Sequence, residues 1–410
     1  MKFLHTADLH LGRFLDNRPR WPEQQAILDE IAALVETERV DLALLAGDIF
    51  DAFIPPAAAE QMFYLFAERL AAAGCAVVAI AGNHDQPQRL AAAQALAAHR
   101  GIFLIGMPGT RFPATTAADG IGCLPSRNAL RLRLANGEQA VVAALPYLSE
   151  ARLQELYTED ITDEVGARHD YQRVLLEKME QLAADFRPDT ANFVLAHLFV
   201  AGGHSSDSER PLSMQVGGSF GVSRDVFPAG ADYIALGHLH RAQQVRHVVP
   251  CFYAGSPLAY SFSECDQVKA VMLGEIAWDE AGKKQITLQA IPLQAGRPLA
   301  IWRVGSYAEA LQRCSDPALQ DVWVSLQIEL EQPLTAEQLD ALQAAHPCLV
   351  AVTPLYREQG EVAEYAPMEE KSIPQRFADF VLESEGVAAD DALLDAFCQL
   401  LAEEEEEEEE

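Results

Sequence analysis

The sequence predicts an α/β fold, namely a two-layered β-sandwich flanked by helices, with a small α+β capping domain and C-terminal helices added. Residues 2–105 alternate apolar, strand-like runs with amphipathic helical segments, which is the pattern of βαβ units. Five apolar runs in the first 240 residues also stop abruptly at Asp, His or Asn side chains. Because α/β sheets keep their sites at the carboxyl ends of strands, these stops predict one shared site.

The first layer is expected within residues 2–105. Pro22 opens a helix whose apolar residues fall on one face, and a second helix begins at Pro55-Pro56 and ends at Gly74. An alanine-rich third helix stops near Gly101. The strands expected between these helices are FLHTADLH, DLALLAGD, AVVAIA and IFLI, at residues 3–10, 41–48, 76–81 and 102–105.

Later segments are expected to build the second layer. Alternating apolar and polar residues over 129–145, on either side of an Asn-Gly pair, predict a β-hairpin. A long polar stretch, 149–170, precedes a helix expected over Tyr171–Asp185. A second polar loop, 202–218, is either a substrate-contacting loop or a solvated excursion. The strands expected to complete the layer are residues 269–276 and 285–293.

Beyond residue 293, a compact βαβαβ pattern predicts a small separate domain, in which Thr335 and Gln338 resemble a helix capping box. A polar linker and two short amphipathic helices follow. Such short helices are marginal alone in water, so their apolar stripes must pack on this chain or on a partner. The expected layout is a main domain over 1–293, a capping domain over 294–356, a linker over 357–371, C-terminal helices over 372–402 and an acidic tail over 403–410.

Composition narrows the class of protein. The sequence contains neither an apolar run of about 18 residues nor a signal-peptide pattern, which predicts a cytoplasmic protein without a membrane span. Its seven cysteines are odd in number and include no CxxC pair, which predicts reduced thiols. The formal net charge is −31, including eight consecutive glutamates. Such a surface repels DNA unless bound cations or a basic partner supply the grip.

The five polar strand ends carry the residue types of a site for two metal ions. Carboxylate, imidazole and amide ligands together suit Mn²⁺ or Fe²⁺ better than ions that prefer thiolates. A single D-x-H triplet is usually a pair of surface residues or a structural histidine, but five such ends in one chain favour a metal site. The candidate residues are Asp8, His10, Asp48, Asp51, Asn83, His84, His197, His238 and His240.

The motifs DLH, GDIFD, GNHD, AHL and GHLH, in this order, resemble the calcineurin-like metallophosphoesterase superfamily. The segments HTADLHLG, AGDIFD, AGNHD and ADYIALGHLHRAQ, followed by YAGSPLAYSFSE, are similar to the bacterial DNA repair nuclease subunits within it. The resemblance implies two divalent ions, with Mn²⁺ the expected ion. The ligands it implies are Asp8, His10, Asp48 and His240 for one ion, and Asp48, Asn83, His197 and His238 for the other.

The resemblance also implies a catalytic role for His84, because the family uses this position for proton transfer to the leaving oxygen or for stabilising the transition state. A carboxylate behind an imidazole sets its tautomer and raises its basicity, so Asp85 or Asp51 is the expected orienting partner. Archaeal and eukaryotic relatives commonly carry a histidine where this chain has Asp51. A second catalytic role for Asp51 therefore stays open.

The implied function is that of a Mn²⁺-dependent DNA exonuclease and endonuclease, which acts by a two-metal mechanism in double-strand-break and hairpin processing. The resemblance further implies a homodimer and a partner, an SMC-like ATPase with a long coiled coil, to which the C-terminal helices would dock. Phe14, Trp21 and Phe63 are candidates for the dimer interface or for ordinary core. The alternatives are a small-molecule phosphoesterase, which the acidic charge favours, and a non-catalytic scaffold that docks DNA, against which the intact ligand set argues.

Overall fold

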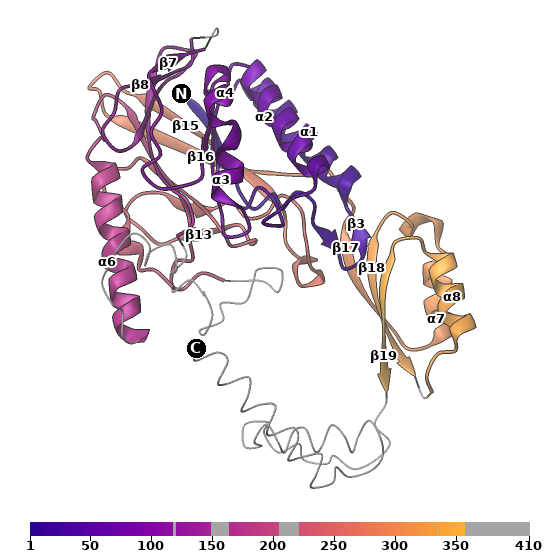
Figure 1. Cartoon of the computed structure of the whole chain (residues 1–410). Coiled ribbons are helices and arrows are strands. Elements are labelled where there is room, and N and C mark those ends of the chain that lie inside the picture. Colours follow the sequence, from indigo (N-terminus) through magenta and orange to yellow (C-terminus); the bar gives the residue numbers. More distant parts are fainter. Residues whose placement is uncertain (118–119, 149–163, 205–220, 331, 357–410) are drawn as a thin grey trace. The chain divides into compact units, whose positions relative to one another are not determined.

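Two β-sheets carry the fold in the structure, which is a computed structural model (Figure 1). Residues Met1–Leu355 form one unit, and the segment from Tyr356 onward forms a second. The predicted linker, C-terminal helices and acidic tail lie outside the described residues, as does most of the loop predicted over 202–218. The structure describes residues 1–117, 120–148, 164–204, 221–330 and 332–356.

The first sheet has six strands in the order β16-β15-β1-β4-β5-β6. Its strands β1, β4, β5 and β6 pair in parallel, and β15 and β16 continue the sheet in antiparallel pairing. Two amphipathic helices, α1 (Trp21–Glu38) and α2 (Ala57–Ala72), connect the parallel strands as predicted. The strand bounds are β1 Lys2–Thr6, β4 Leu42–Leu45, β5 Ala76–Ile80, β6 Ile102–Ile105, β15 Ala270–Trp278 and β16 Lys284–Pro292.

The prediction of one continuous alanine-rich helix before β6 is wrong. The chain forms two one-turn helices there, α3 (Pro87–Leu90) and α4 (Gln94–Ala97), each followed by a 3₁₀ turn. Within them only Pro87, Leu90 and Ala98 are buried. Small alanine side chains bury little apolar area, so packing does not hold the segment in one continuous helix.

The second sheet has eight strands in the order β13-β14-β12-β11-β10-β9-β8-β7. The predicted hairpin is confirmed, because β9 and β10 pair antiparallel around Gly137, whose φ of +86° suits the turn. Helix α6 (Glu164–Ala183) begins seven residues before the predicted start, within the stretch that was predicted as a polar loop. The strand bounds are β7 Thr115–Thr116, β8 Gly122–Leu124, β9 Leu130–Arg133, β10 Gln139–Leu145, β11 Ala191–His197, β12 Tyr233–Gly237, β13 Gln243–Val245 and β14 Cys251–Tyr253.

The two sheets pack face to face. Phe3 on β1 contacts Phe193 on β11 and Tyr233 on β12, with ring centroids 5.0 and 4.8 Å apart. Helices α1 and α2 share an apolar core with the outer face of the first sheet, and α6 shares one with the second sheet (Figure 1). The predicted sandwich flanked by helices is confirmed.

The residues named as candidates for a dimer interface differ in exposure. Phe63 on α2 is fully buried in the core between this helix and the first sheet, so it is an ordinary core residue. Trp21 is partly buried and packs against the same core. Phe14, on the two-residue strand β2 (Phe14–Leu15) that pairs with β3 (Arg18–Pro19), keeps 45% of its surface exposed.

The predicted βαβαβ pattern forms a three-stranded sheet, β17-β18-β19, with its own core around Trp302. The capping box of Thr335 and Gln338 is present at the start of α8. Trp323 donates its indole N–H to the carboxylate of Glu23 on α1, at 3.0 and 3.1 Å. The element bounds are β17 Leu299–Val304, α7 Tyr307–Cys314, β18 Trp323–Leu330, α8 Ala336–Ala345 and β19 Leu349–Tyr356.

Candidate metal centre

The predicted metal ligands follow the carboxyl ends of parallel strands in both sheets. In the first sheet β1, β4 and β5 are neighbours in parallel register, and in the second β11 and β12 are. The sequence segments after these strands therefore meet at one edge of the sandwich. The residues follow or end β1 (Asp8, His10), β4 (Asp48), β5 (Asn83, His84), β11 (His197) and β12 (His238, His240).

Three glycines allow a close approach of the two sheets at this edge. A Cβ atom on Gly237 would lie 1.9 Å from the backbone carbonyl oxygen that precedes Gly47. A Cβ atom on Gly47 would lie 2.3 Å from Nδ1 of His197, and one on Gly82 would lie 2.1 Å from Oδ1 of Asp48. Each glycine directly precedes a candidate ligand. The glycines of the GDIFD, GNHD and GHLH motifs are thus required by contacts across the site.

Four of the candidate ligands have a strained backbone. Asp8, His10, Asp48 and His238 have positive φ angles of 55, 43, 48 and 111°. Among the residues described, only two other non-glycine positions have a positive φ. Left-handed conformations at side-chain-bearing residues cost energy and concentrate at functional sites, so this clustering supports a functional role for the edge.

Asp8, His10, Asp48 and His240 form a first cluster. Ligand atoms of Asp8, His10 and Asp48 lie within 4.8 Å of one another, and all three residues are buried. His10 Nε2 lies 2.9 Å from Nε2 of His240 and 3.7 Å from Oδ2 of Asp48. Two imidazole nitrogens that face each other need a proton or a cation between them, so this geometry suits a shared metal ion.

Asn83, His197 and His238 meet Asp48 in a second cluster. His197 donates Nδ1–H to the carbonyl oxygen of Ala46 at 2.8 Å, which leaves a lone pair on Nε2. This Nε2 lies 2.9 Å from Oδ1 of Asn83 and 3.5 Å from Oδ2 of Asp48. Nδ1 of His238 lies 3.0 Å from the same amide oxygen. A cation would satisfy these converging lone pairs.

Burial keeps the imidazoles of the site in the form that binds metal. Desolvation lowers the pKa of His238 to about 3, lowers the pKa of His197 and holds the pKa of His10 well below its ordinary range. A metal binds the neutral imidazole, so these ligands need lose no proton near pH 7. The nitrogen and oxygen donors, with no thiolate among them, suit divalent metal ions that do not require thiolate ligands.

His84 faces the same edge. Its backbone N–H donates to Oδ1 of Asp48 at 2.8 Å, and its ring Nδ1–H donates to the backbone carbonyl of Asp51 at 2.7 Å. The second bond fixes the tautomer and leaves a lone pair on Nε2. The carboxylate of Asp51 is 4.0 Å from His84 Nδ1 and closer, 3.3 Å, to Nδ1 of His10. A peptide carbonyl therefore takes the orienting role that was expected of a carboxylate.

Asp85 contacts the backbone rather than the ring of His84. Its buried carboxylate accepts hydrogen bonds from the backbone N–H groups of Ile49, Phe50 and Gly82, at 3.1, 2.9 and 2.8 Å. Burial and a neighbouring carboxylate raise the pKa of Asp85. These bonds tie the loop after β4 to the loop after β5. The expectation that Asp85 orients His84 is not met by these contacts.

The ion pair of Glu264 and Lys269, which lies beside His240, was not predicted from the sequence. Burial opposes ionisation of Glu264, but the neighbouring His240 ring and the Lys269 ammonium outweigh it and lower the pKa of this carboxyl to about 2. Tyr260 donates its hydroxyl to the carbonyl of Leu9 and packs edge-on against His10 and His240. The available signal was the segment YAGSPLAYSFSE, which ends at Glu264 but to which no role was assigned.

Arg13 was also missed, although it directly follows the HTADLHLG motif. Its Nη1 lies 3.5 Å from Oδ1 of Asp51, and its guanidinium stacks over the ring of Tyr260, 5.3 Å from the centroid. The side chain is 18% exposed. It places a positive charge beside an otherwise acidic and imidazole-rich site.

Comparison with known proteins assigns the fold and the site to a class. The family model described as calcineurin-like phosphoesterase matches residues 1–242, which include every candidate metal ligand. The chain belongs to this family, and it is therefore a hydrolase of the metallophosphoesterase class.

Relatives place the chain more narrowly. SbcD of Bacillus subtilis (strain 168), which is named as part of the nuclease SbcCD, is 38% identical over 404 residues, which cover 98% of this chain and 97% of that protein. The SbcD proteins of Rhodobacter capsulatus and Escherichia coli (strain K12) are 30% and 28% identical, over 90% and 88% of this chain and 90% and 86% of their own lengths. The chain belongs to the SbcD family of nuclease subunits. Its described helices include none that is long and apolar enough to cross a membrane.

Proposed function

We propose that this chain hydrolyses DNA phosphodiester bonds as a Mn²⁺-dependent exonuclease and endonuclease with a two-metal site. The observation that carries the proposal is the position of Asp48. Its Oδ2 lies 3.7 Å from Nε2 of His10 in the first cluster and 3.5 Å from Nε2 of His197 in the second. One carboxylate oxygen beside two groups of ligands is the arrangement expected of a bridging ligand in a two-metal hydrolase. The proposed ligands are Asp8, His10, Asp48 and His240 for one ion, and Asp48, Asn83, His197 and His238 for the other.

Two divalent ions held by these residues would polarise the phosphodiester and lower the pKa of the attacking water. The chain's own residues supply the geometry. The bond from Nδ1 of His84 to the carbonyl of Asp51 fixes the ring and leaves Nε2 to exchange a proton. In its protonated form, that nitrogen can donate a proton to the departing sugar oxygen or stabilise charge on the phosphate. Arg13, beside Asp51, adds a guanidinium that suits a phosphate oxygen.

The negative charge of the chain indicates that a basic partner is needed for DNA binding. A formal charge of −31 opposes binding to a polyanion, because DNA affinity rests largely on Lys and Arg contacts to phosphate. The relatives are named as subunits of a complex, SbcCD. We therefore propose that an SbcC-type SMC-like ATPase supplies much of the grip on DNA, in double-strand-break and hairpin processing. The predicted docking of residues 372–402 to this partner stays a prediction.

A homodimer is the proposed state of the protein. With Phe63 buried in the core, the support comes instead from exposed apolar side chains on the outer helices. Leu65 on α2 is 57% exposed, and Leu96 on α4 is 79% exposed. Single exposed apolar residues also occur on monomers, and an interface requires that they form part of one contiguous patch. Sedimentation of wild type and of Leu65→Glu would test it, with dissociation expected for the variant.

The substrate assay separates the proposal from its alternatives. The purified chain would be incubated with Mn²⁺ and one of three substrates: bis-p-nitrophenyl phosphate, AMP and hairpin DNA. Cleavage of the diester and of DNA, with stimulation of DNA cutting by the ATPase partner and ATP, is the expected result. Preference for AMP over both diesters would instead establish a small-molecule phosphoesterase. DNA binding without hydrolysis of any substrate would establish a docking scaffold.

A further inference from the structure

Glu264 lies on the side of the His240 ring opposite to the first metal cluster. His240 Nε2 faces Nε2 of His10, whereas its Nδ1 faces the Glu264 carboxylate, 3.9 Å from Oε1. Both residues are 1% exposed. We propose that Glu264 is a positioning residue that holds the His240 ring with Nε2 toward the cluster, and so sets the affinity of that one metal site. This inference rests on the proposed two-metal function.

The carboxylate of Glu264 is itself held on both oxygens. Oε1 accepts the backbone N–H of Tyr260 at 3.2 Å, and Oε2 accepts the ammonium of Lys269. The same ammonium donates to the backbone carbonyl of His240 at 3.0 Å and to the hydroxyl of Ser256 at 3.0 Å. The pair therefore holds His240 twice, with the carboxylate on the ring and the ammonium on the peptide.

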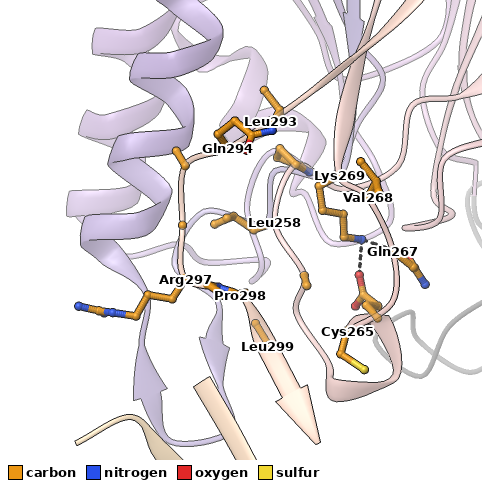
Figure 2. Close-up of a pocket in the computed structure, with 15 residues that line it drawn as sticks. Leu258, Cys265, Gln267, Val268, Lys269, Leu293, Gln294, Arg297, Pro298 and Leu299 are labelled. Atoms are coloured by element: carbon orange, nitrogen blue, oxygen red, sulfur yellow. Dashed lines mark hydrogen bonds and ion pairs between the residues drawn. The ribbon is translucent and has the colours of Figure 1, made fainter. Parts of the chain in front are cut away.

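The chain before Glu264 also packs closely on His240. A Cβ atom at Gly255 would lie 2.6 Å from the carbonyl oxygen of His240, and Ser256 N–H donates to that oxygen at 3.1 Å. On another side, Glu264 and Lys269 line a pocket of about 370 Å³ (Figure 2). The space in this pocket can accommodate a small shift of an altered side chain, so an isosteric change at Glu264 should leave the fold intact.

The partner nearest to the Nδ1 atom of the ligand histidine differs between the two clusters. In the first cluster, Nδ1 of His10 lies 3.3 Å from the carboxylate of Asp51, as Nδ1 of His240 faces Glu264. In the second, Nδ1 of His197 instead donates to a peptide carbonyl at 2.8 Å, and the nearest carboxylate oxygen, Oδ1 of Asp8, is farther away at 3.9 Å. A carboxylate behind a ligand histidine fixes its orientation and raises its basicity, and loss of such a partner typically weakens metal binding about 10- to 100-fold. Loss of Glu264 should therefore weaken one of the two sites.

The test is Mn²⁺ titration of the full chain, with free Mn²⁺ followed by its electron paramagnetic resonance signal. Wild type should bind two ions. Glu264→Gln should bind one of them about 10- to 100-fold more weakly and the other within about twofold of wild type. Asp232→Asn is the matched control, because Asp232 also pairs with a partly buried lysine, Lys284, at 2.7 Å. Both Mn²⁺ affinities of the control should equal those of wild type.

A double-mutant cycle with His240→Ala shows whether Glu264 acts through the ring. If it does, Glu264→Gln should add less than about twofold to the loss that His240→Ala already causes. An equal further loss in that background, or unchanged binding by Glu264→Gln alone, would overturn the inference. Fewer than two Mn²⁺ ions on wild type would overturn the proposed function itself, and the positioning role with it. Melting curves of the metal-free variants verify that each one is folded.

Discussion

Replacement of Asp48 by Asn should weaken both proposed metal sites at once. The change removes one negative charge near His10 and His197, whose Nε2 atoms lie 3.7 and 3.5 Å from Oδ2. The amide oxygen can still accept the backbone N–H of His84, now bonded to Oδ1 at 2.8 Å. Two unit charges about 4 Å apart interact by about 4 kcal/mol at an effective dielectric constant of about 20. The binding free energy of each divalent ion should become weaker by at least about 4 kcal/mol, which corresponds to a loss of about 1000-fold in affinity.

Metal counting by inductively coupled plasma mass spectrometry, after equilibration at a series of Mn²⁺ concentrations, measures this loss. His10→Ala is the comparison, since His10 belongs to the first cluster alone and its removal should mainly empty one site. Melting temperatures of both metal-free proteins verify the fold. An Asp48→Asn protein that still holds two ions at wild-type affinity would refute the bridging role.

Three further predictions follow from single contacts. His84→Gln should keep both metals and the fold but lose about 10²- to 10⁴-fold in the rate of diester hydrolysis, and near-normal cleavage would remove His84 from the mechanism. Gly82→Ala should destabilise the protein by about 1–3 kcal/mol in urea unfolding, because its Cβ would meet Asp48, whereas Gly230→Ala, whose nearest neighbour is 3.7 Å away, should not. Burial lowers the pKa of His5 from its ordinary 6.5 to about 3. The unfolded chain therefore binds this proton first, and His5 alone should contribute a loss of about 1.4 kcal/mol of stability per pH unit between about 6.5 and 3, in addition to the losses from the other buried histidines of the metal-free protein. His5→Asn should reduce that slope, and an unchanged slope would contradict the reasoning.

The strand ends of the site could be predicted because the signal is local. An apolar run such as residues 41–48 that stops at Gly-Asp indicates a buried strand with polar residues at its end without knowledge of any other segment. The glycines are visible in the motifs themselves, but the contacts that require a glycine at each position come from distant segments of the chain. Only the folded chain shows that Gly47 faces His197 across the site.

The supporting residues could not be predicted, because their roles depend on the direction in which a loop folds. Asp85 follows His84 in the chain, yet its carboxylate turns toward the backbone of Ile49 and Phe50. The peptide carbonyl of Asp51, which carries no sequence signal, orients the histidine instead. Glu264 reaches His240 only because the segment after β14 folds back on the end of β12. A contact between residues about 24 positions apart leaves no periodic trace in the sequence.

Neither sheet contains a complete metal site by itself. The proposed first site joins Asp8, His10 and Asp48 of the six-stranded sheet to His240 of the eight-stranded sheet, and the second also takes ligands from both. The ligands therefore come together only when the sheets pack, and the glycine contacts fix how closely they do so. Packing also buries the imidazoles in their neutral form, which disfavours protonation and leaves their lone pairs directed at one another. Packing of the two sheets thus brings the lone pairs of the ligands together. Binding of a cation at this edge should in turn stabilise the packing of the sheets.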